Sequence, residues 1–276
     1  MQMTRREFLT GIAASGLSGC VGPRRGDAET IRIVHLGDPQ LGFSLPIDTE
    51  ESYQACLDRF LKMVAKANAL RPDLVVVSGD MCHHAADLER DWPSLLRRFD
   101  RPVVFTPGNH DLGNAVTAEN LARFRKVFGL DRDAFEIKGW FFIVGNSQFW
   151  RPTKLKTEQA EYERWVTARL EEARGFNGCV VGVTHIPPFV RAVDENDSYN
   201  NYPKSGRAQR IARYRAVGLD MYLAGHTHRY GRRKVDGLTI LNSETTSRNF
   251  DRRPFGGRIL TLNPDRSYSY QFISVF

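Results

Sequence analysis

Short, continuously apolar runs alternate along this chain with longer stretches in which apolar residues recur every three or four positions. The short runs predict buried strands, and the longer stretches predict amphipathic helices. The predicted strands cover residues 31–36, 74–77, 103–105, 179–183 and 221–223. The predicted helices cover residues 50–70, 87–99, 117–128, 158–174 and 206–217. Such an alternation is typical of an α/β protein with helices on the faces of its sheets.

Two further regions complete the predicted organisation. Residues 135–144 have the pattern of a hairpin, and residues 238–241 and 257–262 predict a β-rich end of the chain. Residues 191–205 are polar and show no clear period, which predicts a long loop. Long loops in compact domains are often functional, so this one is a candidate to contribute to a site.

Side chains with metal-binding or acid–base chemistry follow directly after the predicted strands. They are Asp38, Asp80, Asn109, His110, His185, His226 and His228. Open α/β folds form their sites at this end of the strands. Carboxylate, imidazole and amide donors without thiolates suit Mn, Fe or Zn. The set is large enough for two ions about 3.5–4 Å apart, with Asp80 as the natural bridge.

Two expectations concern the histidines. His226 and His228 alternate, so a strand through them would present both imidazoles on one face, as ligands of adjacent metals require. His35 lies inside the first predicted strand and is expected to be structural.

The order of these motifs resembles that of the calcineurin-like metallophosphoesterases. Along the chain it reads Gly-Asp, Gly-Asp, Gly-Asn-His-Asp, His and Gly-His-x-His. The resemblance covers roughly residues 31 to 275 and implies a four-layer α/β/β/α sandwich. Within the family, Asp38-Pro39-Gln40 and Asn146-Ser147-Gln148-Phe149 resemble a branch of metal-dependent phosphatases that act on phosphoserine or phosphothreonine in proteins.

The resemblance also implies roles for individual residues. Two divalent or trivalent ions (Mn, Fe or Zn) are expected. The first is assigned to Asp38, Asp80 and His228, and the second to Asp80, Asn109, His185 and His226. His110 is implied as the catalytic acid that protonates the leaving group, with Asp111 orienting its imidazole.

One position departs from the family pattern. Most members have a His ligand to the first metal where this chain has Gln40, and a neutral amide is a poorer donor. Either the first site is weaker here, or another group completes it. Purple acid phosphatases also lack that His and use a Tyr three residues after the bridging Asp, which corresponds to His83. His83 is therefore a candidate ligand or a neighbour of the ligands, with Cys82 as a further alternative.

The implied reaction is hydrolysis of a phosphate monoester by attack of a metal-bridging hydroxide. Three alternatives remain open on the sequence. The fold also supports phosphodiesterases and nucleotidases. A cell-envelope phospholipid phosphatase is a second alternative. A non-catalytic binding protein, in which Gln40 marks a degraded metal site, is the third.

The N-terminus carries two export motifs. Arg5 and Arg6 form a twin-arginine pattern followed by a short, mildly apolar stretch, and Cys20 ends a sequence that resembles a lipobox. We therefore expect a lipoprotein signal peptide over residues 1–20 with Cys20 as the first, lipidated mature residue, a linker over 21–29 and one domain over 30–276. The protein is expected to be exported by the twin-arginine route and anchored by lipid on the periplasmic or cell-surface face of a membrane.

Charge is unevenly distributed along the chain. The formal net charge is +7, and residues 201–258 hold thirteen Lys or Arg against four Asp or Glu, a local excess of nine. This excess predicts either a solvated basic face or attraction of a phosphorylated small-molecule, lipid or protein substrate. Aromatic residues are too sparse among the cations to indicate a platform for nucleic acid, so no specific nucleic-acid partner is expected.

Overall fold

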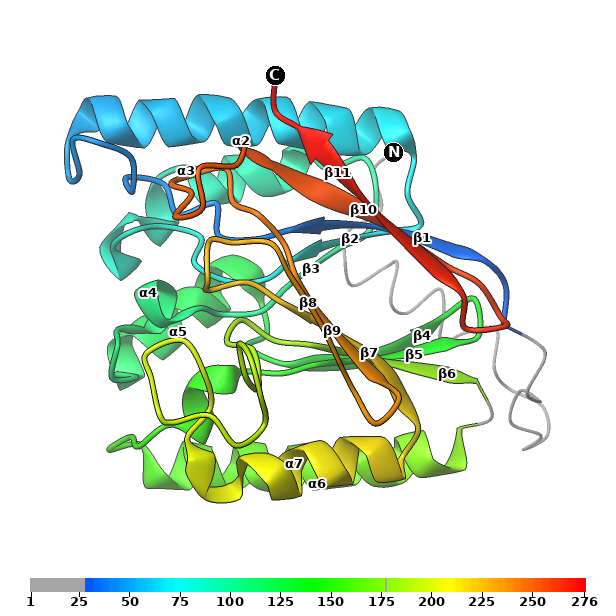
Figure 1. Cartoon of the computed structure of the whole chain (residues 1–276). Coiled ribbons are helices and arrows are strands. Elements are labelled where there is room, and N and C mark those ends of the chain that lie inside the picture. Colours follow the sequence, from blue (N-terminus) through cyan, green and yellow to red (C-terminus); the bar gives the residue numbers. More distant parts are fainter. Residues whose placement is uncertain (1–27, 177) are drawn as a thin grey trace.

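Two β-sheets face each other in the middle of the molecule, and helices cover the outer face of each sheet (Figure 1). The computed structural model describes residues 28–176 and 178–276. The predicted signal peptide, its Cys20 and nearly all of the predicted linker lie outside the described residues. The four layers confirm the fold expected from the resemblance.

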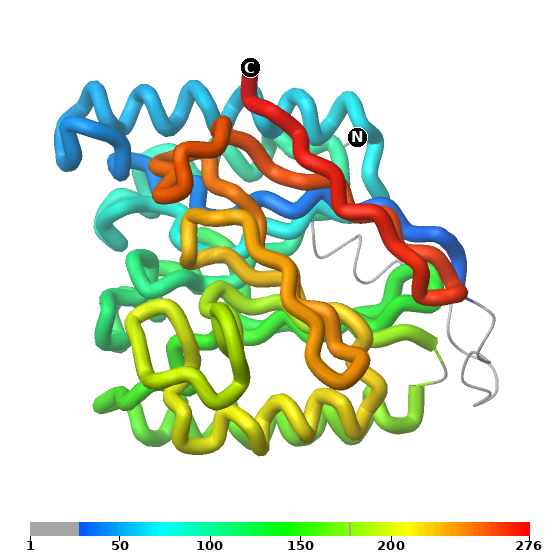
Figure 2. Tube along the Cα trace, in the orientation of Figure 1, coloured from blue at the N-terminus to red at the C-terminus, as the bar shows by residue number. Residues whose placement is uncertain are grey.

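The first sheet has the strand order β11-β10-β1-β2-β3. Its strands are β1 (Ile31–Leu36), β2 (Leu74–Val77), β3 (Val103–Phe105), β10 (Gly256–Leu262) and β11 (Tyr268–Ser274). The first three are parallel, and β10 joins them antiparallel, beside β1. The last strands of the chain therefore lie next to the first (Figure 2). Helices α2 (Glu50–Leu70) and α3 (Leu88–Leu95) cover this sheet.

The second sheet has the order β4-β5-β6-β7-β9-β8. Its strands are β4 (Asp133–Ile137), β5 (Trp140–Val144), β6 (Cys179–Val183), β7 (Leu219–Ala224), β8 (Gly231–Val235) and β9 (Leu238–Asn242). Helices α6 (Lys156–Gly175) and α7 (Lys204–Ala216) cover its outer face (Figure 1). Strand β8 is the edge strand next to β9, and its central residues are exposed.

The continuous apolar runs are explained by burial on both faces of the parallel strands. In β2, Val75 and Val77 pack in the core beneath the helices, whereas Leu74 and Val76 pack between the two sheets. A parallel strand covered on both faces has no polar position, which is why the run contains no alternation.

Two helices differ in detail from the prediction. Residues 85–98 form η1 (Ala85–Asp87), α3 and η2 (Leu96–Arg98) in place of one continuous helix. Pro93 lies inside α3, and the two changes of helix type fall on either side of it, before Leu88 and after Leu95. In α7, Ser205 and Gly206 have non-helical backbone angles, so the regular helix begins near the predicted residue 206. The remaining helices are α4 (Asn109–Leu112), which the pattern did not predict, and α5 (Ala118–Phe128).

Within the described residues, the helices are either too short or too polar to cross a bilayer. His35 is fully buried in β1, with its ring nitrogens 2.8 Å from the Tyr270 hydroxyl and 2.9 Å from the Ser78 hydroxyl. Both nitrogens are thus used by hydroxyl groups of the core, as the expected structural role requires.

Candidate metal centre

The predicted metal-binding side chains meet at one edge of the two sheets. Asp38, Asp80, His185, His226 and His228 lie in loops after β1, β2, β6 and β7, and Asn109 begins α4. All six side chains belong to residues that are buried, with at most 5% exposure. Polar groups so deeply buried need partners to offset the loss of water.

One group of ligand atoms surrounds His185. Its Nε2 atom lies 3.0 Å from the Asn109 Oδ1, 3.0 Å from the His226 Nδ1 and 3.3 Å from the Asp80 Oδ2. Ligands held about 2.0–2.2 Å from one ion lie roughly 3–3.5 Å from each other. These four atoms therefore have the spacing of a single coordination shell, and they are the residues predicted for the second metal.

A second group contains Asp38, Asp80 and His228. One donor atom of each lies within 4.8 Å of the others, and the His228 Nε2 is 3.6 Å from the Asp38 Oδ1. These are the residues predicted for the first metal. Asp80 belongs to this group and also to the group with His185 and His226, so its carboxylate is the donor that the two groups share.

The backbone around the ligands is unusual. Asp38, Asp80, His226 and His228 have φ angles of 47°, 50°, 69° and 50°. Non-glycine residues seldom adopt this left-handed region, and such strain clusters at functional sites. Strand β7 ends at Ala224, close to the predicted end at Leu223, so His226 and His228 lie in the loop after it and not on a strand that presents both on one face. Both imidazoles are buried in the site because left-handed turns, rather than strand alternation, orient them.

The glycines of the motifs allow close approach of the ligands. A Cβ atom on Gly108 would lie 2.0 Å from the Asp80 Oδ1, and one on Gly79 would lie 2.3 Å from the His185 Nδ1. Neither position has space for a side chain, so any other residue would displace a predicted ligand.

The electrostatics of the site are those of a buried anionic cluster. Burial raises the pKa of Asp38 to about 8, with the Asp80 carboxylate adding to the effect and His185 opposing it. Burial lowers the pKa of His185, but the carboxylates of Asp80 and Asp38 more than compensate and raise it to about 9. Burial lowers the pKa of His228 to about 4 and that of His226 well below its ordinary value. His226 and His228 therefore favour the neutral form that a metal ligand needs, whereas His185 and Asp38 would have to release a proton on binding a cation.

Gln40 gives an independent test of whether a cation fits. It is 1% exposed and lines the cavity above the site, and its Oε1 atom is buried without a hydrogen-bond partner among the described residues. An unsatisfied buried acceptor is costly, and a cation would satisfy it. The residues present therefore fit a metal centre, with Gln40 able to offer the oxygen that replaces the family's His.

His83 lies beside the site but groups with other residues. Its Nδ1 is 3.4 Å from the Gln40 Nε2, and its Nε2 is 3.4 Å from the Asp48 Oδ1. The described structure groups it with Asp48 and His84 rather than with Asp38 and Asp80. The main chain of His83 orients the His110 imidazole, because its carbonyl oxygen accepts a hydrogen bond of 2.8 Å from the His110 Nδ1.

His110 is held from two sides. Its backbone N–H donates to the Asp80 Oδ1 at 2.9 Å, and its Nδ1–H donates to the carbonyl of His83. The side chain lines the cavity, and these bonds leave Nε2 as its unused nitrogen within the described residues. The described hydrogen bonds join the imidazole to His83 rather than to Asp111, the residue expected to orient it. The Asp111 carboxylate accepts the backbone N–H groups of Gly108 and Met81 at 2.8 and 2.7 Å, and therefore braces the loop.

Tyr199 and Phe43 were missed as site residues, and both line a cavity of about 590 Å³ above the ligands. The Tyr199 hydroxyl is 2.6 Å from the Asn109 Nδ2, and its carbonyl accepts a 2.7 Å hydrogen bond from the His226 Nε2. Phe43 stacks on His83 with ring centroids 4.8 Å apart. The long polar loop was the available signal for Tyr199, whereas no local pattern indicated Phe43.

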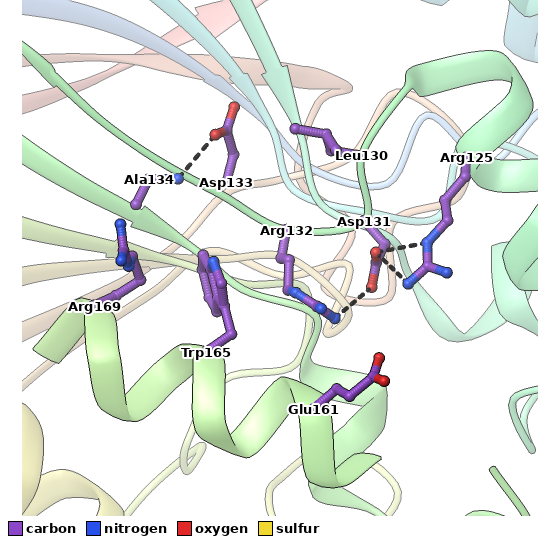
Figure 3. Close-up of a pocket in the computed structure, with 9 residues that line it drawn as sticks. All are labelled: Arg125, Leu130, Asp131, Arg132, Asp133, Ala134, Glu161, Trp165 and Arg169. Carbon is purple, nitrogen blue, oxygen red and sulfur yellow. Dashed lines mark hydrogen bonds and ion pairs between the residues drawn. The ribbon is translucent and has the colours of Figure 1, made fainter. Parts of the chain in front are cut away.

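A second hollow, of about 490 Å³, lies between α6 and the segment before β4 and shares no residue with the cavity (Figure 3). Its buried carboxylate, that of Asp131, is paired within the hollow. The Asp131 carboxylate, 4% exposed, is 2.8 Å from the Arg125 guanidinium and accepts a 3.1 Å hydrogen bond from the Asn146 side chain. We therefore assign this hollow a structural role.

Comparison with known proteins agrees with the geometry. The family model described as calcineurin-like phosphoesterase matches residues 31–230. The serine/threonine-protein phosphatase CPPED1 of Pongo abelii is 30% identical over 208 residues, which are 71% of this chain and 66% of that protein. The chain thus spans slightly less than two thirds of that relative. A probable cyclic nucleotide phosphodiesterase of Synechococcus sp. (strain WH7803) is 24% identical over 272 residues, 86% of this chain and 93% of that protein.

A solved structure supports the fold independently. A dimetal phosphatase from Danio rerio matches with a TM-score of 0.63 at 14% identity, covering 89% of this chain and 96% of that one. The predicted resemblance is therefore confirmed. The chain belongs to the calcineurin-like phosphoesterase family, whose members are metal-using hydrolases of phosphoester bonds.

Proposed function

We propose that this protein is a two-metal phosphatase that hydrolyses phosphate monoesters. The observation that carries the proposal is the position of Asp80, whose carboxylate belongs to both candidate ligand groups. Asp38, His228 and Gln40 would hold the first ion with Asp80, and Asn109, His185 and His226 would hold the second. When bound, such ions activate water as a nucleophile near neutral pH and neutralise phosphoryl oxygens.

The protein's own groups would handle the leaving group and the geometry. His110 presents Nε2 to the cavity while the His83 carbonyl holds Nδ1–H, so a protonated His110 can donate from Nε2 to the departing oxygen. Tyr199 would keep His226 and Asn109 in place through its carbonyl and its hydroxyl. Burial of the ligand side chains lowers the dielectric around them, which strengthens the charge interactions there.

A phosphodiesterase is the second candidate, since the Synechococcus relative is named a probable cyclic nucleotide phosphodiesterase and is matched over most of its length. The monoester is favoured by the phosphatase name of the CPPED1 relative, which is 30% identical, against 24% for the Synechococcus relative.

Metal removal and a pair of esters test this function. Chelation should abolish turnover of p-nitrophenyl phosphate. Adding Mn, Fe or Zn should lower the activation barrier again by several kcal/mol and raise the rate on the order of 10³-fold. The restored protein should cleave p-nitrophenyl phosphate faster than bis-p-nitrophenyl phosphate. Faster cleavage of the diester would favour the phosphodiesterase. Stoichiometric metal without turnover of either ester would make the protein a binding module.

We further propose that the protein is exported and lipid-anchored, on the basis of Arg5, Arg6 and Cys20. Replacing Cys20 with Ala should move the exported protein from the membrane fraction to the soluble fraction on cell fractionation. Substitution of the arginine pair with lysines should instead retain the protein inside the cell. A protein that stays on the membrane after Cys20→Ala would contradict the lipid anchor.

A further inference from the structure

Three arginines line the same cavity as the candidate ligands. We call Arg191, Arg229 and Arg233 the arginine wall, and the cavity that they line also contains Asp80 and His226. Arg191 lies on the loop after β6, Arg229 directly follows the candidate ligand His228, and Arg233 lies on the edge strand β8. Segments far apart in the chain therefore bring cations to one side of the predicted reaction site.

Within the described residues, the arginine wall forms no ion pairs with carboxylates. Arg233 donates from Nε to the Val190 carbonyl at 2.9 Å and from Nη1 to the Arg232 carbonyl at 2.8 Å. These neutral acceptors fix the guanidinium without cancelling its charge. Across the described part of the chain, no ion pair joins an Asp or Glu to any of the three guanidinium groups.

Three carboxylates follow Arg191 on the same loop, those of Asp194, Glu195 and Asp197, and none forms an ion pair with its guanidinium in the described structure. Glu195 is occupied elsewhere. Glu195 accepts the backbone N–H groups of Val190 and Arg191, each at 2.8 Å, and an N–H of the Asn201 side chain at 2.6 Å. Its carboxylate therefore holds two parts of the same loop together through these hydrogen bonds. The loop is thereby fixed, while the Arg191 guanidinium remains free to bind a ligand.

On the edge strand β8, Arg233 lines the cavity, whereas its neighbour Arg232 does not. Successive side chains of a strand point to opposite faces. Gly231 and Arg233 line the cavity, whereas the guanidinium of Arg232 lies 5.3 Å from the centre of the Tyr268 ring. Arg232 thus carries the same charge on the same strand, outside the cavity.

We propose that the arginine wall binds a second anionic group of the substrate, so that the preferred substrates are phosphomonoesters that carry another phosphate or carboxylate. The inference rests on the proposed phosphatase function and narrows its substrate class. The reacting phosphate would lie at the ligand groups, and the second anion would accept hydrogen bonds from the guanidinium groups of the arginine wall. Charged hydrogen bonds of this kind each change affinity by about tenfold or more.

A kinetic comparison provides the first measurement. Released phosphate is followed for fructose 1,6-bisphosphate and 2,3-bisphosphoglycerate, and for fructose 6-phosphate as the singly phosphorylated reference. The wild-type kcat/KM should be about tenfold higher for at least one bisphosphate. The Arg191→Gln/Arg229→Gln variant should raise KM for that bisphosphate by about tenfold or more and leave p-nitrophenyl phosphate within about twofold. The Arg232→Gln variant is the matched control and should behave as wild type.

Calorimetry tests whether the arginine wall binds a second anion independently of whether the protein is a phosphatase. The metal-loaded His110→Ala protein is titrated with the same sugar and glycerate phosphates, so affinity is measured without turnover. Tighter binding of a bisphosphate that is lost in Arg191→Gln/Arg229→Gln supports the arginine wall even if the wild type cleaves no ester. Equal affinity for one and two phosphates, or an equal loss in Arg232→Gln, overturns it.

Discussion

We expect the Asp80→Asn substitution to remove both metal ions together and to lower turnover on the order of 10³-fold or more. The amide that replaces the carboxylate cannot carry the negative charge that a bridge between two cations needs. Asp80 is the one residue common to the groups around His185 and His228, so its loss weakens both at once. Loss of a ligand to one site alone, as in His228→Ala, should leave the other ion bound.

Elemental analysis after gel filtration measures this directly. The wild type should retain about two equivalents of metal per chain, and Asp80→Asn much less than one. Asp131→Asn is the matched control, since it also removes the charge of a buried carboxylate, paired with Arg125 and outside the cavity (Figure 3). It should lower the free energy of unfolding and keep both ions. Two tightly bound equivalents in Asp80→Asn would contradict the bridging assignment.

The elements of the fold could be predicted where burial leaves a periodic signal. Strand β2 reads as continuously apolar because both of its faces are covered. Helix α2 was predicted with its observed ends because Thr49 caps one end and Pro72 closes the other. Helix α3 was predicted too long because apolar periodicity does not distinguish an α-helix from the short 3₁₀ turns, η1 and η2, at its ends.

The candidate site could be predicted as a set of residues but not as a geometry. The Gly-Asp and Gly-His motifs identify the ligands, yet the left-handed backbone at His226 and His228 leaves no hydrophobic pattern, and their alternation resembles a strand. The contact of Tyr199 with Asn109 joins residues ninety positions apart, which no local spacing can indicate. Such contacts depend on the sheet order, which the sequence pattern alone leaves open.

The role of Gln40 could also not be predicted from the sequence alone. From the sequence, an amide in place of the family's His suggested a weakened or degraded site. The structure buries its Oε1 without a partner among the described residues and directs Gln40 to the cavity. That arrangement favours a retained oxygen donor, because a decayed site has no reason to keep an unsatisfied acceptor buried.

We expect the His110→Ala substitution to lower turnover of alkyl phosphates about 10²–10⁴-fold while both metal ions remain bound. The side chain belongs to neither candidate ligand group, and the backbone N–H that it gives to Asp80 survives in alanine. What is lost is the Nε2–H beside the departing oxygen. An alkoxide leaving group needs that proton, whereas p-nitrophenolate is stable without it, so the loss on p-nitrophenyl phosphate should be much smaller.

The ratio of the two losses is therefore the informative quantity. His84→Ala is the matched control, because His84 is an exposed neighbour of His83 that does not line the cavity. It should leave the rates on both esters near those of wild type. An equal loss on the alkyl and nitrophenyl esters in His110→Ala would assign His110 to binding the phosphate rather than to protonating the leaving group. A loss of metal would instead mean that the imidazole supports Asp80, and the proton would then have to come from water or another cavity residue.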